Sequence, residues 1–332
     1  MATIYDIARE AGVSIATVSK VINQTGRISD KTRKHVQDVM KRIDYQPSVV
    51  ASALTKKRTY SLGLLIPDIA NPFFAELARS IEDHAHDLGY SLVICSTDND
   101  LTREERYINV LRQKSADGII IATGARNDAM MKQLMKYKLP VAVIAREMPL
   151  LAVDTVLVDD YLGGYLAASH LTGLGHRNIA VIAEDLAVMS SKERVRGYRK
   201  ALEEAGIPYD ENLVAVSPFH VEGGKATAKE LLSGSNPPSA IFGCNDLLAI
   251  GVVQAARELG LRVPEDVSVV GFDNTVLATI IDPPLTSVAQ PVQQMGKEIV
   301  QLITGEIDGS KPSKQRLVLL PELVVRGTTS AV

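Results

Sequence analysis

Short apolar runs that alternate with amphipathic stretches constrain the fold of this chain more than any other feature. From residue 61 onward these runs include LGLLIPD, LVICST, GIIIAT, VAVIA, IAVIAE, AIFGCND and VSVVGFD. The stretches between them, such as FFAELARSIEDHAHDLG and ERVRGYRKALEEAG, repeat apolar residues at helical spacing. Nearly continuous apolar strands separated by helices predict parallel sheets with helices on both faces.

The same pattern occurs twice along the chain. Its second copy begins near Asn178, so we expect two doubly wound lobes of similar size rather than one very wide sheet. In such a pair, the carboxyl ends of the strands line the cleft between the lobes, where ligands bind. The length of 332 residues is sufficient for two or three domains.

The first 45 residues have a different pattern, that of three short helices. Residues 4–11 place apolar side chains on one face, with Thr3 as a candidate N-cap and Gly12 where the helix ends. Ser14 is the candidate N-cap of a second helix, and Ser29 is that of a third. Three short helices with a glycine turn between the first two predict a helix-turn-helix domain.

Charge divides the chain at the same place. Residues 1–60 contain 11 Lys and Arg against 5 Asp and Glu, a balance of +6, whereas the whole chain sums to −3 and the remainder therefore to −9. A basic segment on an acidic body favours nucleic-acid binding by the N-terminal part. A solvated basic surface has the same composition, so charge alone leaves both interpretations open.

Several classes of protein are disfavoured by the composition. The sequence has two cysteines, Cys95 and Cys244, which cannot form a disulfide framework or a four-cysteine zinc site. No apolar run approaches the roughly 18 residues of a membrane span, and the amphipathic start MATIYDIAREAG is unlike a signal peptide. We therefore expect a cytoplasmic protein that does not contact a membrane.

The sequence also lacks the motifs of the common enzyme classes. It contains no G-x-x-x-x-G-K-[ST], no G-x-G-x-x-G after a strand, no H-E-x-x-H and no G-x-S-x-G. His84 and His86 are two residues apart on a helix and point to different faces, so they cannot share a metal. Neither His170 nor His176 has a ligand partner at metal spacing, so we expect solvated or capping histidines. We expect no catalytic residues, no metal and no other cofactor.

The motifs themselves resemble a known family. The run IYDIAREAGVSIATVSKVINQTGRISDKTRKHVQDVMKRIDYQPSVVASAL is similar to the headpiece of the LacI/GalR transcription regulators. The resemblance continues in IPDIANPFFAELARSIED, ERVRGYRKALEEAG, NDLLAIGVVQAARELG, VPEDVSVVGFDN and LTSVAQPVQQMG, and so covers nearly the whole chain. It implies an α/β fold: a helix-turn-helix headpiece at 1–46, a hinge helix or linker at 47–59, and a core at 60–332. That core would be two lobes of doubly wound parallel sheet, as in periplasmic sugar-binding proteins, and would bind the effector and dimerise.

The resemblance also implies which residues contact DNA. Ile15, Ala16 and Lys20 match positions that read base edges in the major groove, and Lys20 replaces a commoner arginine, which predicts softer discrimination at its base. Leu54 matches a leucine that wedges into the minor groove, with Ala51 one turn earlier. The phosphate contacts match Ser14, Thr17, Ser29 and Thr32. The remaining implied DNA-binding positions are Thr3, Ser19, Asn23 and the Tyr45–Gln46 pair.

In the core, the resemblance implies an effector site in the cleft. Phe73 and Phe74 would stack on the effector, and Arg194 would clamp a hydroxyl or carboxylate. The other implied lining residues are Arg146, Ser190, Phe219, Asn245, Asp273 and Gln290. Asp273 follows an apolar strand, which suits a binding residue but equally suits a helix N-cap.

One departure from the family pattern bears on the charge of the ligand. Many members that bind neutral sugars carry an aspartate after the strand VAVIA, where this chain has Ala145 followed by Arg146. Arg146 and Arg194 together favour a sugar acid or sugar phosphate over a neutral sugar. Alternatively, Arg146 pairs with Glu147 or Asp160 on the surface, as most arginines do.

The function that the resemblance implies is that of a transcription regulator, a repressor that binds a pseudo-palindromic DNA operator as a homodimer. A small metabolite in the cleft would change the angle between the lobes and thereby move the two hinge segments. An alternative is a catabolite-control regulator with a phosphorylated carrier protein as corepressor, but the expected docking helix MGKEIVQLITGEIDG has Lys297 as its one cation. The headpiece and the lack of a signal peptide disfavour a transport-type sugar-binding protein, and the missing catalytic motifs disfavour an enzyme.

Overall fold

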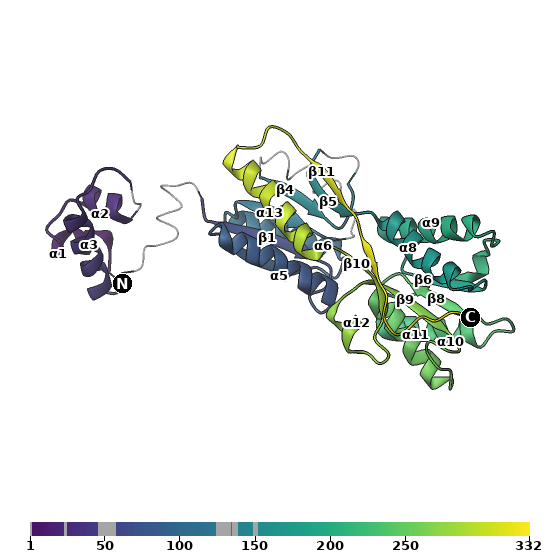
Figure 1. Ribbon diagram of the computed structural model, residues 1–332. Coiled ribbons are helices and arrows are strands. Elements are labelled where there is room, and N and C mark those ends of the chain that lie inside the picture. The colour runs from purple at the N-terminus through teal and green to yellow at the C-terminus, as the bar shows by residue number, and fades with distance from the viewer. Residues whose placement is uncertain (1, 23–24, 46–57, 124–133, 135–138, 149–151) are drawn as a thin grey trace. The chain divides into compact units, whose positions relative to one another are not determined.

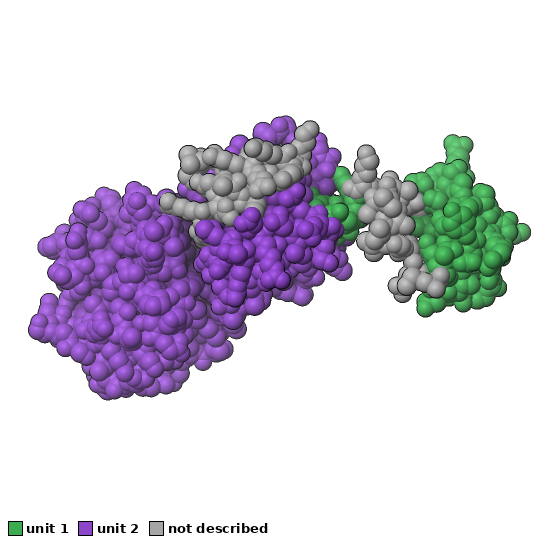
Figure 2. Space-filling view, turned by 180° about the vertical axis from the view of Figure 1, so that it is seen from behind, with its two compact units in different colours: residues 1–60, 115–117 green, residues 61–114, 118–332 purple. Residues whose placement is uncertain are grey.

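The chain forms two compact units, which Figure 2 colours separately. The computed structural model describes residues 2–22, 25–45, 58–123, 134, 139–148 and 152–332. The smaller unit comprises residues 1–60 with 115–117, and the larger comprises residues 61–114 with 118–332.

The smaller unit contains the three short helices predicted from the sequence: α1 (Ile4–Glu10), α2 (Ile15–Ile22) and α3 (Asp30–Arg42). Thr3 forms a capping box with Asp6 at the start of α1, and Ser29 accepts a hydrogen bond from Thr32 N at the start of α3. Gly12 has a φ of 63°, which ends the first helix in the left-handed conformation that glycine tolerates. The core of this unit consists of Ile7, Ala8, Ala11, Val18, Val21, Val36 and Val39.

The larger unit contains two six-stranded sheets, so the expected two-lobed α/β fold is confirmed (Figure 1). The first sheet has the order β11-β5-β4-β3-β1-β2, and its strand pairs are parallel. Its strands are β1 (Ser61–Ile66), β2 (Ser91–Ser96), β3 (Gly118–Ile121), β4 (Val141–Ile144), β5 (Asp154–Val158) and β11 (Arg316–Leu319). Its helices are α5 (Pro72–Asp87), α6 (Leu101–Gln113) and α13 (Val292–Asp308).

The second sheet has the order β12-β10-β9-β8-β6-β7 and is parallel except for its edge strand β12. Its strands are β6 (Ile179–Ala183), β7 (Val214–Val216), β8 (Ala240–Gly243), β9 (Ser268–Asp273), β10 (Thr286–Ala289) and β12 (Glu322–Val324). Its helices are α8 (Asp160–Gly173), α9 (Met189–Glu204), α10 (Val221–Leu232), α11 (Asp246–Glu258) and α12 (Val276–Ile280), with a short 3-10 helix at Glu211–Leu213.

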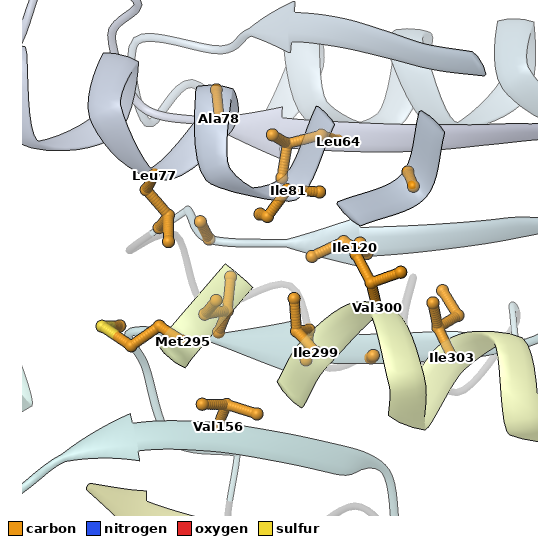
Figure 3. Packing of buried hydrophobic residues seen from close by; sticks show 14 of the residues in the cluster. Leu64, Leu77, Ala78, Ile81, Ile120, Val156, Met295, Ile299, Val300 and Ile303 are labelled. Atoms are coloured by element: carbon orange, nitrogen blue, oxygen red, sulfur yellow. The ribbon is translucent and has the colours of Figure 1, made fainter. Parts of the chain in front are cut away.

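Helices cover both faces of these sheets, as the apolar strands require. In the first lobe α5 and α13 pack together on one face, where Ile81 of α5 and Ile299 of α13 meet Ile120 of the sheet (Figure 3). In the second lobe one face is covered by α8 and α9, and the other by α10 and α11. Each lobe therefore has its own apolar core.

The two lobes do not correspond to the two halves of the chain. The second lobe begins with α8, before the expected start at Asn178, and the chain later returns to the first lobe to add α13 and β11 (Figure 1). A strand pattern identifies a strand but does not identify the sheet that it joins. As a result, the sequence did not predict these returning segments.

Two histidines that we expected to be solvated or capping are structural instead. His176 is 4% exposed, and its ring nitrogens bond the Ser239 hydroxyl at 2.9 Å and the Ser330 carbonyl oxygen at 3.1 Å. His170 Nε2 lies 2.9 Å from the hydroxyl of Thr329. These bonds attach the C-terminal segment to the second lobe, a long-range contact that local sequence does not reveal. Among the helices that the structure describes, none has the length and apolar character to cross a membrane.

Candidate nucleic-acid interface and ligand cleft

Helix α2 has a buried face and an exposed face. Val18 and Val21 pack into the core of the small unit, whereas Ile15, at 42% exposure, Ala16 and Lys20 face solvent. Because an α-helix has 3.6 residues per turn, burial of Val18 and Val21 on one face leaves the other three residues on the opposite, exposed side. The three positions implied to read base edges therefore share the exposed surface of one helix.

Two pairs of hydroxyl groups lie at helix N-termini in the same unit. Ser14 Oγ is 2.9 Å from Thr17 Oγ1 at the start of α2, and Ser29 Oγ is 2.8 Å from Thr32 Oγ1 at the start of α3. Helix N-termini carry partial positive charge and unpaired amide groups, and so suit phosphate oxygens. All four residues of the implied phosphate set thus lie at the start of a helix.

The other implied DNA-binding residues have mixed outcomes. Thr3 is exposed and caps α1, Ser19 is half-buried, and Tyr45 packs on the three-helix core. The positions at Asn23, Gln46, Ala51 and Leu54 lie outside the described residues.

In the larger unit, a cavity of about 670 Å³ lies at the carboxyl ends of the strands of both sheets. Pro67 follows β1, Asp160 follows β5, Glu184 follows β6 and Gln290 follows β10, while Asp273 ends β9. This is the location expected for a ligand site in doubly wound sheets. The implied effector residues that line it are Phe73, Phe74, Arg146, Ser190, Arg194, Phe219, Asp273 and Gln290.

Asn245 is the one implied effector residue that is not part of the described wall. Its side-chain oxygen accepts a hydrogen bond from Leu248 N at 2.8 Å and so caps helix α11. The residue is fully buried. Its sequence position after β8 is that of a lining residue, but its side-chain oxygen is used to cap α11.

The aromatic part of the wall comes from the start of helix α5. Asn71 is its N-cap and Pro72 its first residue, an arrangement that fixes where the helix begins. The rings of Phe73 and Phe74 then meet edge to face, with centroids 5.1 Å apart. Both side chains line the cavity, so they offer a ligand an apolar surface in the first lobe.

Arg194 contacts the other polar groups in the charged part of the second-lobe wall. Its Nε donates to Asp160 Oδ1 at 2.8 Å, and its Nη1 donates to the carbonyl oxygen of Cys244 at 2.5 Å. The same Nη1 is 3.9 Å from Asp273 Oδ1, and the guanidinium lies 3.6 Å from the centre of the Phe272 ring. Both of these nitrogens of Arg194 are therefore engaged inside the protein.

Two glycines make the contact between Arg194 and Asp160 possible. A Cβ at Gly164 of α8 would overlap the carbonyl oxygen of Arg194, and one at Gly197 of α9 would overlap that of Tyr161. The two helices can therefore cross at close range, with Arg194 on one and Asp160 at the start of the other.

Burial shifts the ionisation of this cluster. It raises the pKa of Asp160, Glu184 and Asp273, while the positive charge of Arg194 acts in the opposite sense on all three. Burial also raises the pKa of the Cys244 thiol to about 12. Cys244 is therefore protonated at neutral pH and is a poor nucleophile.

Backbone strain occurs at two points of the wall. Asp273 has a φ of 107° and Ala145 one of 55°, both in the region that favours glycine. Asp273 Oδ1 accepts a hydrogen bond from Gln290 Nε2 at 2.7 Å, and the following helix has Thr275 as its N-cap. The alternative role of Asp273 as an N-cap is therefore wrong.

Arg146 is held by groups behind the wall. Its Nη1 donates to the carbonyl oxygen of Thr123, whose hydroxyl donates to buried Glu104 at 2.6 Å. The charge of Arg146 opposes the rise that burial produces in the pKa of Glu104. The two carboxylates that we considered as partners of Arg146 form ion pairs elsewhere, Glu147 with Arg316 and Asp160 with Arg194.

The sequence interpretation missed most of the acidic residues of the wall. Asp68, Asp98, Glu147, Asp160 and Glu184 all line the cavity. Each follows the carboxyl end of a strand within three residues, so the rule that ligand sites collect there would have found them. Within the described residues, no group of His, Cys, Asp and Glu is arranged to hold a metal ion.

One hydrogen bond joins the two lobes close to the cleft. Glu76 of α5 accepts from Val276 N of α12 at 2.9 Å. The N-cap of α12, Thr275, makes no side-chain capping bond. Glu76 of the other lobe instead accepts a hydrogen bond from a backbone amide at this helix N-terminus. A change in the angle between the lobes would break or strain this bond.

Comparisons with known proteins cover both units. The model of bacterial regulatory proteins of the lacI family matches residues 3–48, and that of periplasmic binding protein-like domains matches residues 168–329. The chain is 51% identical over 331 residues to the HTH-type transcriptional regulator DegA of Bacillus subtilis strain 168, covering 99% of this chain and 98% of DegA. It is 37% identical to catabolite control protein A of Priestia megaterium, over 91% of each chain.

A solved structure that is similar over nearly the whole chain is that of the lac repressor dimer bound to operator and the anti-inducer ONPF. It matches with a TM-score of 0.89 and 29% identity, over 99% of both chains. The likeness therefore includes the headpiece and the two-lobed core. The relatives in these comparisons are transcription regulators.

Proposed function

The chain belongs to the LacI family of bacterial transcription regulators, and we propose that it is a repressor whose residues 1–46 bind operator DNA. In this proposal residues 47–59 are the hinge, and residues 60–332 form the core that binds a small effector and dimerises. The protein acts in the cytoplasm, on DNA, and has no catalytic role.

The observation that carries the DNA-binding proposal is the exposed surface of α2. Ile15 and Ala16 present apolar groups to solvent beside the cationic Lys20. In the major groove, apolar side chains suit thymine methyl groups, and a lysine donates to guanine. The hydroxyl pairs at the starts of α2 and α3 support the same orientation, since they lie where phosphates would fix the register of the helix.

Selection from a pool of random DNA duplexes tests this function directly. The full chain should enrich a pseudo-palindromic sequence, with a flexible pyrimidine-purine step such as CG at its centre, because unstacking is easiest there. Binding to the selected sequence should exceed binding to shuffled DNA by about a thousandfold or more. Recovery of no common sequence would contradict the proposal.

Two exposed apolar surfaces support a homodimer. Val93 and Ile94 are exposed on the edge strand β2, and Val276 and Ile280 are exposed on α12, with Ile280 at 67%. An uncovered edge strand with apolar side chains is unfavourable in a monomer and suits a partner of the same sequence. A two-fold dimer would in turn explain recognition of a two-fold DNA site.

Control by an effector follows from the position of the cavity between the lobes. A ligand that touches both walls favours one angle between them, and the lobe angle determines the separation of the two hinges in a dimer. Glu76 connects the first lobe to α12, which also carries the exposed Val276 and Ile280. The coupling needs to amount to only about 1–3 kcal/mol.

A protein corepressor is the less favoured alternative. The relevant helix, α13, carries exposed Lys297 as its one cation, with neutral Gln301 one turn later. A phosphoserine is bound by clusters of basic side chains, which this helix lacks along its described surface. We therefore favour a small molecule as the effector.

A further inference from the structure

The wall of the cleft has an excess of negative charge. Its described residues include six carboxylates and two guanidinium groups, those of Arg146 and Arg194. Asp98 and Glu147 pair with Arg103 and Arg316, which lie outside the wall. The carboxylates that remain after these pairs are Asp68, Asp160, Glu184 and Asp273.

The two arginines do not compensate this excess. Arg194 serves Asp160 and Asp273 at once, at 2.8 and 3.9 Å, and Glu184 receives a hydrogen bond from the hydroxyl of Ser191. The charge of Arg146 acts on buried Glu104, a fifth carboxylate behind the wall. Counted together, the described site has five carboxylates for two guanidinium groups.

We propose that the effector carries a protonated amine, which the carboxylates of Asp160, Glu184 and Asp273 bind on the second-lobe wall of the cleft. The proposal rests on the function above and specifies the chemical class of the effector. It also reverses the expectation of an anionic sugar, which depended on two arginines that the structure shows to be engaged with the protein's own acids and carbonyl groups.

A neutral polyol fits this cluster less well than an amine does. Hydroxyl groups can donate hydrogen bonds to carboxylates, but they leave three acids, of which Asp273 is buried and Asp160 and Glu184 are half-buried, beside one guanidinium. Buried charge without a counter-charge is unfavourable, and the raised pKa of each of these carboxyls reflects that burial. An ammonium group supplies both the hydrogen bonds and the missing charge, whereas an added phosphate or carboxylate would be repelled.

The remaining surfaces of the cavity suit the rest of such a ligand. Phe73 and Phe74 provide an apolar face in the first lobe for a sugar ring or another flat body. Gln290 Nε2 donates to Asp273 Oδ1 at 2.7 Å and so helps to hold this carboxylate in place. An amino sugar, with a ring and one amine, matches this distribution of apolar and acidic groups.

A panel of matched ligands tests the proposal on the full chain. The probes are glucose, galactose and mannose, each also as its 2-amino sugar and its uronic acid, with binding followed by calorimetry at pH 7. At least one 2-amino sugar should bind roughly tenfold more tightly than its neutral parent, because charge-assisted hydrogen bonds are stronger than neutral ones. The uronic acids should bind more weakly than the parents.

A conservative variant assigns the preference to the cluster. Glu184→Gln retains the shape of the side chain and removes its charge, so the amine should lose more affinity than its neutral parent and the preference for the amine should fall by roughly tenfold. Glu203→Gln is the matched control, because Glu203 pairs with Arg199 on the exposed side of α9 and is not part of the described wall. An equal loss of both ligands in Glu184→Gln would contradict the role of charge.

The panel with the unaltered chain decides between amine and non-amine effectors even if the variant fails to fold. The proposal is overturned if, for every sugar tested, the neutral or acidic form binds at least as tightly as the amine. It is also overturned if none of the amines binds. Binding to the selected DNA is measured in the same samples without sugar. A lack of DNA binding would contradict the DNA-binding function. The ranking of the sugars tests only the proposal that the effector is an amine.

Discussion

The headpiece and the cleft place their functional side chains in opposite ways. On α2, Ile15 and Lys20 are exposed, lie within one short helix, and play no part in the core. In the cleft, Arg194, Asp160 and Asp273 come from segments distant in sequence, and the buried Arg194 pairs with both acids. Recognition and folding should therefore be separable in the headpiece and inseparable in the cleft.

Removal of the Arg194 charge should have the strongest effect. Arg194→Met leaves Asp160 and Asp273 without their counter-charge, and breaking a buried ion pair typically lowers the free energy of unfolding by about 3–5 kcal/mol. The control is Arg196→Met, two residues along α9, because Arg196 pairs with Glu193 in solvent and should matter little. Denaturant unfolding of the two variants would contradict the comparison if both lost the same stability.

The glycine contact between α8 and α9 gives a second test of the cleft. Gly197→Ala forces a Cβ against the carbonyl oxygen of Tyr161, and overpacking of this kind lowers stability by about 1–3 kcal/mol. Gly173→Ala on α8 is the control, since no other atom lies within 4 Å of its added Cβ. That variant should be more stable than the native chain by up to about 1 kcal/mol. If both alanine variants were equally destabilised, the close crossing of α8 and α9 would not be the cause.

In the headpiece, Lys20→Ala should separate binding from stability. It should weaken binding to the selected operator by about 1–3 kcal/mol and weaken binding to random DNA less. The free energy of unfolding should stay within about 0.5 kcal/mol of that of the native chain, because the side chain is exposed. Equal weakening on both DNAs would make Lys20 a phosphate contact.

The same contrast explains what could be predicted from the sequence. The three helices of the headpiece were predicted closely, because Thr3, Gly12 and Ser29 act within one turn of the residues that they cap. The apolar runs likewise predicted the strands of the core. Helices and strands of this kind depend on residues that are close together in the sequence, so local patterns predict them.

Long-range contacts could not be predicted in this way. The pairing of Arg194 with Asp160 depends on the crossing at Gly164 and Gly197, and the attachment of His176 to Ser330 joins residues 154 positions apart. Because local sequence does not reveal these contacts, it left both arginines of the cleft available for an anion. The structure shows that the surrounding acids outnumber them.

The buried core behind the cleft should respond to pH. Burial raises the pKa of Asp246 from 3.8 to about 6, so the folded chain keeps a proton that the unfolded chain has lost. The stability that this carboxyl contributes is complete below pH 3.8 and is lost as the pH rises through 6. Measured by denaturant unfolding, the stability of the native chain relative to Asp246→Asn should therefore be greater at about pH 5 than at about pH 7.5.

Asp266 provides the contrast for that experiment. Its exposed ion pair with Arg262 lowers its pKa to about 2, so its contribution is lost only as the pH falls through that value. The difference between the native chain and Asp266→Asn should stay constant over the same range. A parallel change in both variants would mean that Asp246 is not the group that titrates.

The central claim is that an exposed, basic headpiece binds DNA through several phosphate contacts together with base contacts from α2. The most direct measurement is the affinity of the full chain for its selected operator as a function of salt. The logarithm of affinity should fall linearly with the logarithm of salt concentration, with a slope of about −0.9 for each phosphate that is neutralised, so about −5 or steeper for six contacts or more. A flat response would contradict the claim.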